Sequence, residues 1–249
     1  NNYEEERWIS YLDENGNGFG SDVLVEDVVK VESGIPFKFK LQVSPYYTPQ
    51  YTVSCGFDVL EPDANGVYTI NNLTQNSEVR VTGLEQAPSF VTGRKDCGSG
   101  TASDPYLLSQ PIDMFYFAVL INSPTLSSYY ATAHYKLVED IDMQGEHLYV
   151  IGDGSNDAMF CGTFDGNNKT IRNFYITDEV VDQESYEEAY LPYVGLFGQA
   201  VATVNAPVVI KNLTLEDYVV KAHPGAAGAG AYVGSLVGYG IGVQITGCR

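Results

Sequence analysis

Basic residues are scarce in this sequence. Lys and Arg number 13 against 32 Asp and Glu, so the formal net charge of the 249-residue chain is −19. A nucleic-acid interface depends on clustered Lys and Arg that neutralise phosphates. The composition therefore predicts that nucleic acid is not a partner.

Long apolar runs and a leader pattern are also missing. No stretch of about 18 apolar residues, the length that crosses a membrane as a helix, occurs in the sequence. The first residues, Asn1-Asn2-Tyr3, include neither an initiator Met nor the basic-then-apolar pattern of a signal peptide. We therefore expect no membrane-spanning segment and interpret the chain as an excised or processed piece.

Cysteine spacing excludes the common sulfur sites. The four cysteines form no Cys-x-x-Cys pair, which argues against zinc and dithiol redox motifs. Their even number leaves disulfides open, but a chain of this length does not need such links, so buried free thiols are favoured. The four residues are Cys55, Cys97, Cys161 and Cys248.

Patterns typical of short strands dominate the N-terminal part of the sequence. Residues 37–43 alternate strictly between apolar and polar, and residues 51–55, 66–70 and 78–82 repeat this period between polar turn stretches. Antiparallel sheets with one wet face generate such alternation. We predict a small β-sandwich or β-grasp-like module over residues 1–92, with a strand at 23–31 and a lead-in over 1–22.

A second domain is predicted over residues 93–249. Residues 86–100 have linker composition. Beyond them, Ser109 is a candidate cap for a helix with Pro111 in its first turn and mostly apolar residues at 112–122. We expect this short helix to cover the end of a solenoid, whose first coil otherwise exposes its core and strand edge.

Repeated words indicate that solenoid. Tyr193-Val194-Gly195-Leu196-Phe197-Gly198 recurs 39 positions later as Tyr232-Val233-Gly234-Ser235-Leu236-Val237-Gly238, and words beginning at Ile171, Ile210 and Ile245 follow one another at spacings of 39 and 35. The period predicts a parallel β-helix of paired coils. We expect the glycines at tight turns and Leu196 and Phe197 in the interior stack. The repeats reach the last residues, so we expect further coils beyond Arg249.

Several words in order resemble those of GLUG-motif proteins, a family of bacterial surface proteins. The words are GTASDPY (residues 100–106), YKLVEDID (135–142), GTFDGN (162–167), GLFG (195–198) and GSLVG (234–238). The sequence departs from the usual pattern at Cys161 and at the extra Ser235. Residues 62–74 also look like the β-modules that precede such domains. The resemblance implies secretion, surface display and adhesion, and it supplies no catalytic residues.

A partial calcium pattern lies near the N-terminus. Asp13, Asn15 and Asn17 place oxygens at alternating positions with Gly18 sixth, but position twelve is Leu24, where calcium loops carry a bidentate Glu. Asn-Gly pairs also close hairpins. The hairpin turn is the favoured interpretation, and calcium binding stays open.

Two carboxylates suggest a polysaccharide-cleaving site. Asp140 and Asp142 flank Ile141, so on a strand both project to one face. Acid–base catalysis needs two groups with separated pKa values across a cleft. A same-strand pair is more often a solvated coil face, which is the interpretation we favour.

The remaining candidates are weaker. The histidines lie in no His-Glu-x-x-His spacing, and no Gly-x-Ser-x-Gly elbow occurs. The Asn-x-Thr acceptors are interpreted as strand and turn residues. An acidic stretch over 178–188, within an excursion reaching residue 191, suits a cationic partner or a solvated loop. The histidines are His134, His147 and His223, and the acceptors are Asn72, Asn168 and Asn212.

Taken together, the sequence predicts a mainly β chain in which a β-sandwich-like module precedes a right-handed parallel β-helix with a short capping helix. The predicted function is that of a non-enzymatic, extracellular, surface-attached adhesion or ligand-binding protein with a host or matrix glycan or protein as partner. The alternatives are a carbohydrate-active β-helix enzyme or carbohydrate-binding protein, and a purely structural surface component. No catalytic, cofactor-binding or metal residues are predicted.

Overall fold

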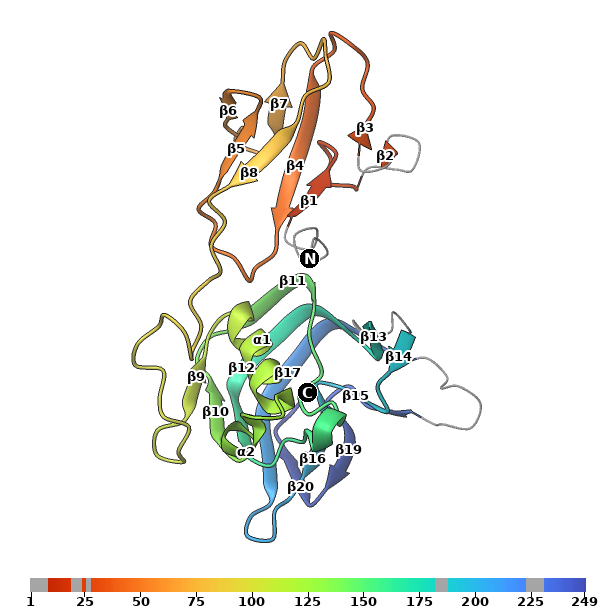
Figure 1. Cartoon of the computed structure of the whole chain (residues 1–249). Helices are drawn as coiled ribbons and strands as arrows, with labels where there is room; N and C mark the ends of the chain where they lie inside the picture. Colours follow the sequence, from red (N-terminus) through yellow and green to blue (C-terminus); the bar gives the residue numbers. More distant parts are fainter. Residues whose placement is uncertain (1–8, 19–23, 26–27, 182–187, 223–230) are drawn as a thin grey trace. The chain divides into compact units, whose positions relative to one another are not determined.

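The computed structural model of the chain describes residues 9–18, 24–25, 28–181, 188–222 and 231–249 (Figure 1). Strands greatly outnumber helices among them, which confirms the predicted mainly β class. The chain divides into two compact units, Asn1–Ala87 and Pro88–Arg249. Each unit is described by itself below.

The first unit is antiparallel. One three-stranded sheet has the order β1-β4-β7, another has the order β6-β5-β8, and β2 pairs with β3. The bounds are β1 (Ile9–Leu12), β2 (Leu24–Val25), β3 (Val28–Val29), β4 (Phe37–Val43), β5 (Thr52–Cys55), β6 (Asp58–Leu60), β7 (Tyr68–Ile70) and β8 (Val79–Thr82).

Alternation along β4 builds the core of this unit. Phe39 is fully buried and stacks on Tyr68 with a ring-centroid distance of 5.4 Å, while Lys38 points to solvent. Val53 from the second sheet joins the same cluster. The two three-stranded sheets therefore share one apolar core, as the period of two in the sequence requires.

One strand prediction in this unit is wrong. Residues 23–31 do not form a single strand, because Leu24–Val25 and Val28–Val29 pair with each other antiparallel. In the sequence the polar Glu26 and Asp27 interrupt the apolar run at this point. The lead-in contributes β1, whose register on β4 joins Ile9 to Val43.

Parallel pairing dominates the second unit. Its main sheet has the order β20-β17-β12-β10-β9, with β11 also on β12, and two further parallel pairs are β15 with β18 and β16 with β19. The bounds are β9 (Tyr106–Leu108), β10 (His134–Leu137), β11 (Ile141–His147), β12 (Thr163–Thr177), β13 (Glu179–Val181), β14 (Glu188–Tyr190), β15 (Tyr193–Val194), β16 (Phe197–Val201), β17 (Val208–Lys221), β18 (Tyr232–Val233), β19 (Val237–Ile241) and β20 (Val243–Thr246).

The register of the main sheet places apolar side chains of neighbouring strands on top of one another. Tyr106, Tyr135, Phe164 and Ile210 occupy paired positions on neighbouring strands, and all four are buried. Ile245 continues this ladder on β20 but is 48% exposed. Each apolar side chain is thus covered by the strand that follows it, and β20 forms the exposed edge of the main sheet.

The first repeated word has its predicted register. Tyr193 pairs with Tyr232, 39 positions later, and Phe197 pairs with Val237, so the extra Ser235 is accommodated between the two pairings. Leu196 and Phe197 are fully buried, as predicted. Gly195 is not in the left-handed region; a Cβ there would lie 2.5 Å from the Gly234 carbonyl oxygen. Close backbone approach, and not a tight turn, requires this glycine.

The second word is out of register. Ile171 pairs with Ile141 and Leu215, whereas Ile210 pairs with Phe164 and Ile245. The spacing of 35 therefore joins two residues that pair, Ile210 and Ile245, but the spacing of 39 between Ile171 and Ile210 joins residues that do not pair. The hairpin of β13 and β14, inserted between β12 and β17, alters the chain length from one strand to the next.

Helix α1 (Pro111–Asn122) lies against the aromatic core, and the short α2 (Ser127–Tyr130) follows. Phe117 of α1 is fully buried, with ring centroids 4.1 Å from Tyr135, 5.8 Å from Phe164 and 6.1 Å from Phe197. Its apolar residues lie all around the helix, which is typical of a buried segment. In the part of the chain that the structure describes, no helix has the length and apolarity to cross a membrane.

Truncation of Phe117 should destabilise the second unit. Phe117→Ala removes a fully buried ring, and we expect a loss of about 3–5 kcal/mol in the free energy of unfolding. Hydrogen exchange of the β10 and β12 backbone amides measures this loss within the unit.

The control is Val119→Ala, at an exposed position of the same helix. It should change the free energy of unfolding by less than about 1 kcal/mol. Equal effects of the two substitutions would contradict the assignment of Phe117 to the core.

Candidate functional site

An outward-facing strip of aromatic rings runs across the second unit. Phe115 of α1 lies 5.6 Å from Tyr149, Tyr149 lies 4.6 Å from His147 at the end of β11, and His147 lies 5.1 Å from Tyr175 of β12. Tyr149 is 36% exposed and Tyr175 is 44% exposed. We call these four residues the aromatic strip; Tyr149 and Tyr175 present ring surface to solvent, while Phe115 and His147 are half-buried.

A groove adjoins the strip at Tyr175. It is open, with a volume of about 480 Å³, and its lining combines two aromatic residues and aliphatic surface with two amides and one carboxylate. The lining residues are Gln144, Gly145, Asn173, Phe174, Tyr175, Asp217 and Val219. Such a mixture of apolar walls and a few polar groups is characteristic of ligand sites.

A bend repeated on three strands shapes the groove. Gln144, Asn173 and Asp217 have φ values of 56°, 55° and 49°, in the left-handed region. Asn and Asp tolerate this region better than most residues. Because β12 and β17 pair on both sides of the bend, Asn173 and Asp217 lie next to each other.

The register also aligns the side chains beyond the bend. His147 pairs with Tyr175, and Tyr175 pairs with Val219, so the three side chains form a row on one face of the sheet. Tyr175 belongs to both the strip and the groove. This residue is the centre of the candidate site.

Asp142 is committed to hydrogen bonds beside the groove. Its carboxylate accepts from Asn173 Nδ2 at 2.8 Å, from the Gln144 backbone N–H at 2.9 Å and from Arg172 Nε at 3.0 Å. The hydrogen bond from Asn173 lowers the pKa of the Asp142 carboxyl below its ordinary value of 3.8, and Arg172 lowers it further. Asp142 thus joins β11 to β12.

Asp140 has a comparable role. Its Oδ1 accepts the backbone N–H of Thr170 at 2.9 Å. Both carboxylates therefore tie neighbouring strands together. The geometry favours the structural interpretation of the Asp140 and Asp142 pair over the catalytic one.

The Asp13 loop has the geometry of a hairpin turn. Asp13 Oδ1 accepts the backbone N–H groups of Asn15 and Asn17, each at 2.9 Å, and Leu12 bridges Gly18 antiparallel. The hydrogen bond from Asn17 lowers the pKa of the Asp13 carboxyl. Lys38 Nζ lies 3.0 Å from Glu14 in the same loop.

A second loop repeats this turn with only part of the calcium-like pattern. Asp63 Oδ1 accepts from the N–H groups of Asn65 at 2.8 Å and Val67 at 3.0 Å. Val67, at the position of Asn17, supplies no side-chain oxygen there. The described residues include no group of three or more His, Cys, Asp or Glu side chains that could hold a metal ion. The shared turn therefore accounts for the Asp13 loop.

The histidines and glycosylation acceptors are not brought together. His134 lies on β10 and His147 at the end of β11, while His223 is outside the described residues. Asn72, Asn168 and Asn212 all have positive φ, at 60°, 60° and 54°, which places them at bends of the backbone. The acidic stretch begins at the buried Asp178 and enters the β13–β14 hairpin, and residues 182–187 lie outside the described part.

All four cysteines are free thiols. Cys97 is buried and the other three are half-buried. Burial raises the pKa of the Cys161 thiol, which disfavours its reactive thiolate form. Of the two possibilities, free thiols and disulfides, the structure contains free thiols.

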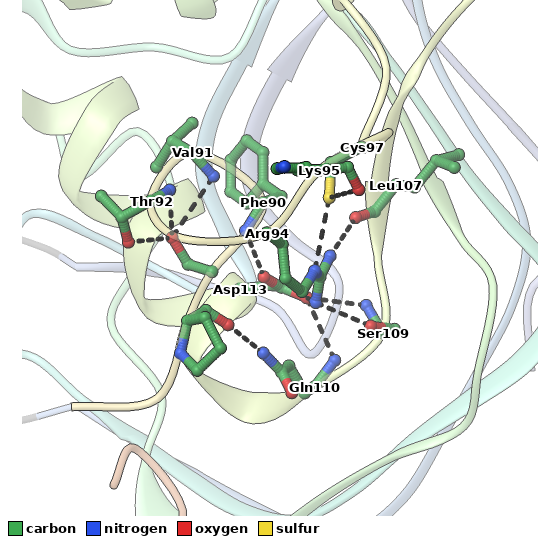
Figure 2. Close-up of polar contacts among 12 residues, drawn as sticks. Phe90, Val91, Thr92, Arg94, Lys95, Cys97, Leu107, Ser109, Gln110 and Asp113 are labelled. Atoms are coloured by element: carbon green, nitrogen blue, oxygen red, sulfur yellow. Dashed lines mark hydrogen bonds and ion pairs between the residues drawn. The ribbon is translucent and has the colours of Figure 1, made fainter. Parts of the chain in front are cut away.

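A buried polar cluster anchors the start of α1 (Figure 2). The Asp113 carboxylate is fully buried and accepts from the Phe90 N–H at 2.7 Å, the Ser109 N–H at 2.8 Å and Arg94 Nη1 at 2.7 Å. Arg94 also donates to the Leu107 carbonyl oxygen and to Cys97 Sγ.

Two predictions change because of this cluster. The N-cap residue of α1 is Gln110, not Ser109, and Asp113 accepts its backbone N–H at 3.2 Å. The division after Ala87 lies within the predicted stretch of 86–100 and before the predicted domain limit at residue 92, but residues 88–100 are not an open linker, since Phe90 and Cys97 are buried. The polar composition of this stretch serves a buried network and not a solvated connection.

Comparison of the chain with family models, with curated proteins and with solved structures finds no match. The candidate site therefore rests on its own geometry.

Sequence reasoning did not identify the aromatic strip or the groove. Phe115, Tyr149, Tyr175 and Asp217 are far apart in the sequence and form no motif. The high tyrosine content is the only signal in the sequence, and a composition does not indicate which tyrosines lie together. Strand register aligns Tyr175 and Asp217 on neighbouring strands, and the packing of α1 brings Phe115 against Tyr149.

Removal of the Asp113 charge should destabilise the second unit. In Asp113→Asn the Arg94 guanidinium loses its buried counter-charge, and we expect a loss of about 3–5 kcal/mol in the free energy of unfolding. Calorimetric unfolding of the full chain measures the loss. The exposed Asp104→Asn is the control, and an equally small change in both variants would show that the cluster adds no stability.

Loss of the Asn173 amide should raise the pKa of Asp142. Because the folded-state pKa is lowered, the stabilisation by this carboxylate is present above its ordinary value of 3.8 and is lost as pH falls through the folded-state pKa. In Asn173→Ala we expect this loss to begin at higher pH. Carboxyl-carbon NMR titration measures the pKa, and an unchanged value would contradict the role of Asn173.

Proposed function

We propose that the chain is a non-enzymatic, surface-displayed ligand-binding protein, as its resemblance to GLUG-motif proteins implies. The observation that carries the proposal is the exposed aromatic strip with its adjoining groove on the parallel sheet. Exposed aromatic side chains beside a few polar groups are typical of binding surfaces. The sheet beneath them holds these side chains in place.

For the architecture we propose a right-handed parallel β-helix in the second unit. Three sets of parallel pairings support it. The first is the sheet β9-β10-β12-β17-β20, and in the second β11 pairs with the later half of β12, which pairs in turn with the later half of β17. The third consists of the pairs β15 with β18 and β16 with β19. Parallel strands in one sheet are joined by right-handed crossovers in nearly all known cases. In this scheme α1 caps the first coil.

The first unit is proposed as a small β-sandwich that acts as a spacer. Its two three-stranded antiparallel sheets contribute Phe39 and Val53 to one core, which supports this assignment. The Asp63 turn between β6 and β7 belongs to the stretch that resembles the modules of surface proteins.

The groove argues against a glycosidase. Glycoside hydrolysis uses two carboxyl groups across the scissile bond. The groove lining contains one carboxylate, Asp217, and the neighbouring Asp142 is occupied by Arg172 and Asn173.

Another carboxyl has the raised pKa expected of a general acid. Burial raises the pKa of Asp153, but its Oδ1 accepts the backbone N–H of Ser155 at 2.8 Å and the Ser155 hydroxyl at 2.6 Å. It is not among the residues that line the groove. Asp153 therefore shapes a turn in this proposal.

The partner that we propose is an extracellular one, either a glycan or a protein of a host or of a matrix. The net charge of −19 is unfavourable for nucleic acid. Localisation at the cell surface follows from the resemblance and stands as part of the proposal.

A glycan and matrix-protein array with the purified chain tests the function. We expect saturable binding to one ligand class, unchanged when calcium is replaced by a chelator, because the Asp13 carboxylate is used by backbone N–H groups. Product release from a bound polysaccharide would overturn the non-enzymatic assignment. Concentration-dependent self-association with no binding on any surface would favour a purely structural component.

A further inference from the structure

We infer that the groove at Tyr175 takes a neutral oligosaccharide. This inference rests on the proposed function and names the chemical class of its ligand. Three properties of the groove carry it: an exposed ring beside aliphatic surface, amide groups at its bend and an acidic charge balance.

The ring provides a surface for stacking. Tyr175 is 44% exposed, and Val219 beside it is 48% exposed. The face of an aromatic ring is electron-rich and attracts weakly positive C–H groups. One face of a pyranose ring presents such C–H groups, so a sugar ring can lie on Tyr175 and continue over Val219.

The amides suit hydroxyl groups. Asn173 and Gln144 lie at the bend of the groove. An amide side chain has both N–H donors and a carbonyl acceptor, and a hydroxyl group also both donates and accepts. Asn173 donates one N–H to Asp142, so a hydroxyl group would meet its second N–H and its carbonyl oxygen, whereas a cationic amine or guanidinium could use only the carbonyl oxygen.

Charge distinguishes neutral from acidic glycans. Asp217 lines the groove, Glu216 precedes it at an exposed position, and the whole chain has a net charge of −19. The nearby Arg172 is paired with Asp142 at 3.0 Å. A uronic acid or sulfated sugar would therefore meet repulsion without a local counter-charge.

The dimensions fit a chain and not a single sugar. The lining residues come from β11, β12 and β17, and three neighbouring parallel strands span about 10 Å. The groove is open to solvent, and the strip continues from Tyr175 through His147 to Tyr149. An extended oligosaccharide can lie across these residues.

Calorimetric titration of the full chain tests the inference. The probes are neutral gluco-, xylo- and manno-oligosaccharides, with oligogalacturonate and oligolysine as charged comparisons. We expect a neutral series to bind with little dependence on salt, and oligogalacturonate to bind at least about tenfold more weakly.

Three variants locate the site. Tyr175→Ala should weaken binding by about tenfold or more, and Tyr175→Phe, which keeps the ring, should stay within about threefold. The control is Phe57→Ala, which removes an aromatic ring that is fully exposed between β5 and β6 of the first unit. It should leave binding unchanged. Since Tyr175 and Phe57 are both exposed, neither substitution should prevent folding.

The outcomes separate the inference from the proposed function. Neutral binding that survives Tyr175→Ala would overturn the assignment to the groove. Stronger, salt-sensitive binding of oligolysine or oligogalacturonate would overturn the ligand class. A protein ligand from the array that depends on Tyr175 would overturn the glycan inference but leave the binding function standing. No saturable ligand in either experiment would overturn both.

Discussion

In-register stacking of apolar side chains on parallel strands is the constraint on which the second unit depends. Tyr106, Tyr135 and Phe164 lie at paired positions and exclude water from one another, and Phe117 of α1 fills the space against them. A shift of one residue would turn each of these side chains to the opposite face. Burial of the aromatic ladder therefore sets the register of the strand segments that carry it, and the β12–β17 register shifts beyond Asp165.

The pairing of these strands also positions the outer surface, although the β11–β12 register shifts between Asp142 and Glu146. Strands that stack Ile141, Ile171 and Leu215 also place His147, Tyr175 and Val219 in an outward row. The candidate site is thus a consequence of core packing, although none of its exposed members contributes much to that packing. The strands that carry the row are paired with one another, which holds its side chains in a fixed order.

Several carboxylates in this acidic chain serve structure. Asp13 and Asp63 close turns, Asp142 joins strands, and Asp113 holds the start of α1. Each accepts N–H groups that the backbone or a side chain presents at fixed positions. This use explains why motifs of acidic residues were poor guides to a site, and it directs attention to the uncharged aromatic surface.

Local chemistry determined much of this protein from sequence alone. Alternation predicted β4, Pro111 and an apolar run predicted α1, and the Tyr193 and Tyr232 words predicted a parallel pair with its register. These features depend on neighbours in the chain or on near-identical words. The register of Ile171, the network of Asp113 and the row through Tyr175 were decided by tertiary structure. The residues in each of these three features are separated by chain segments of unequal length. Tertiary packing therefore selects which of them come into contact.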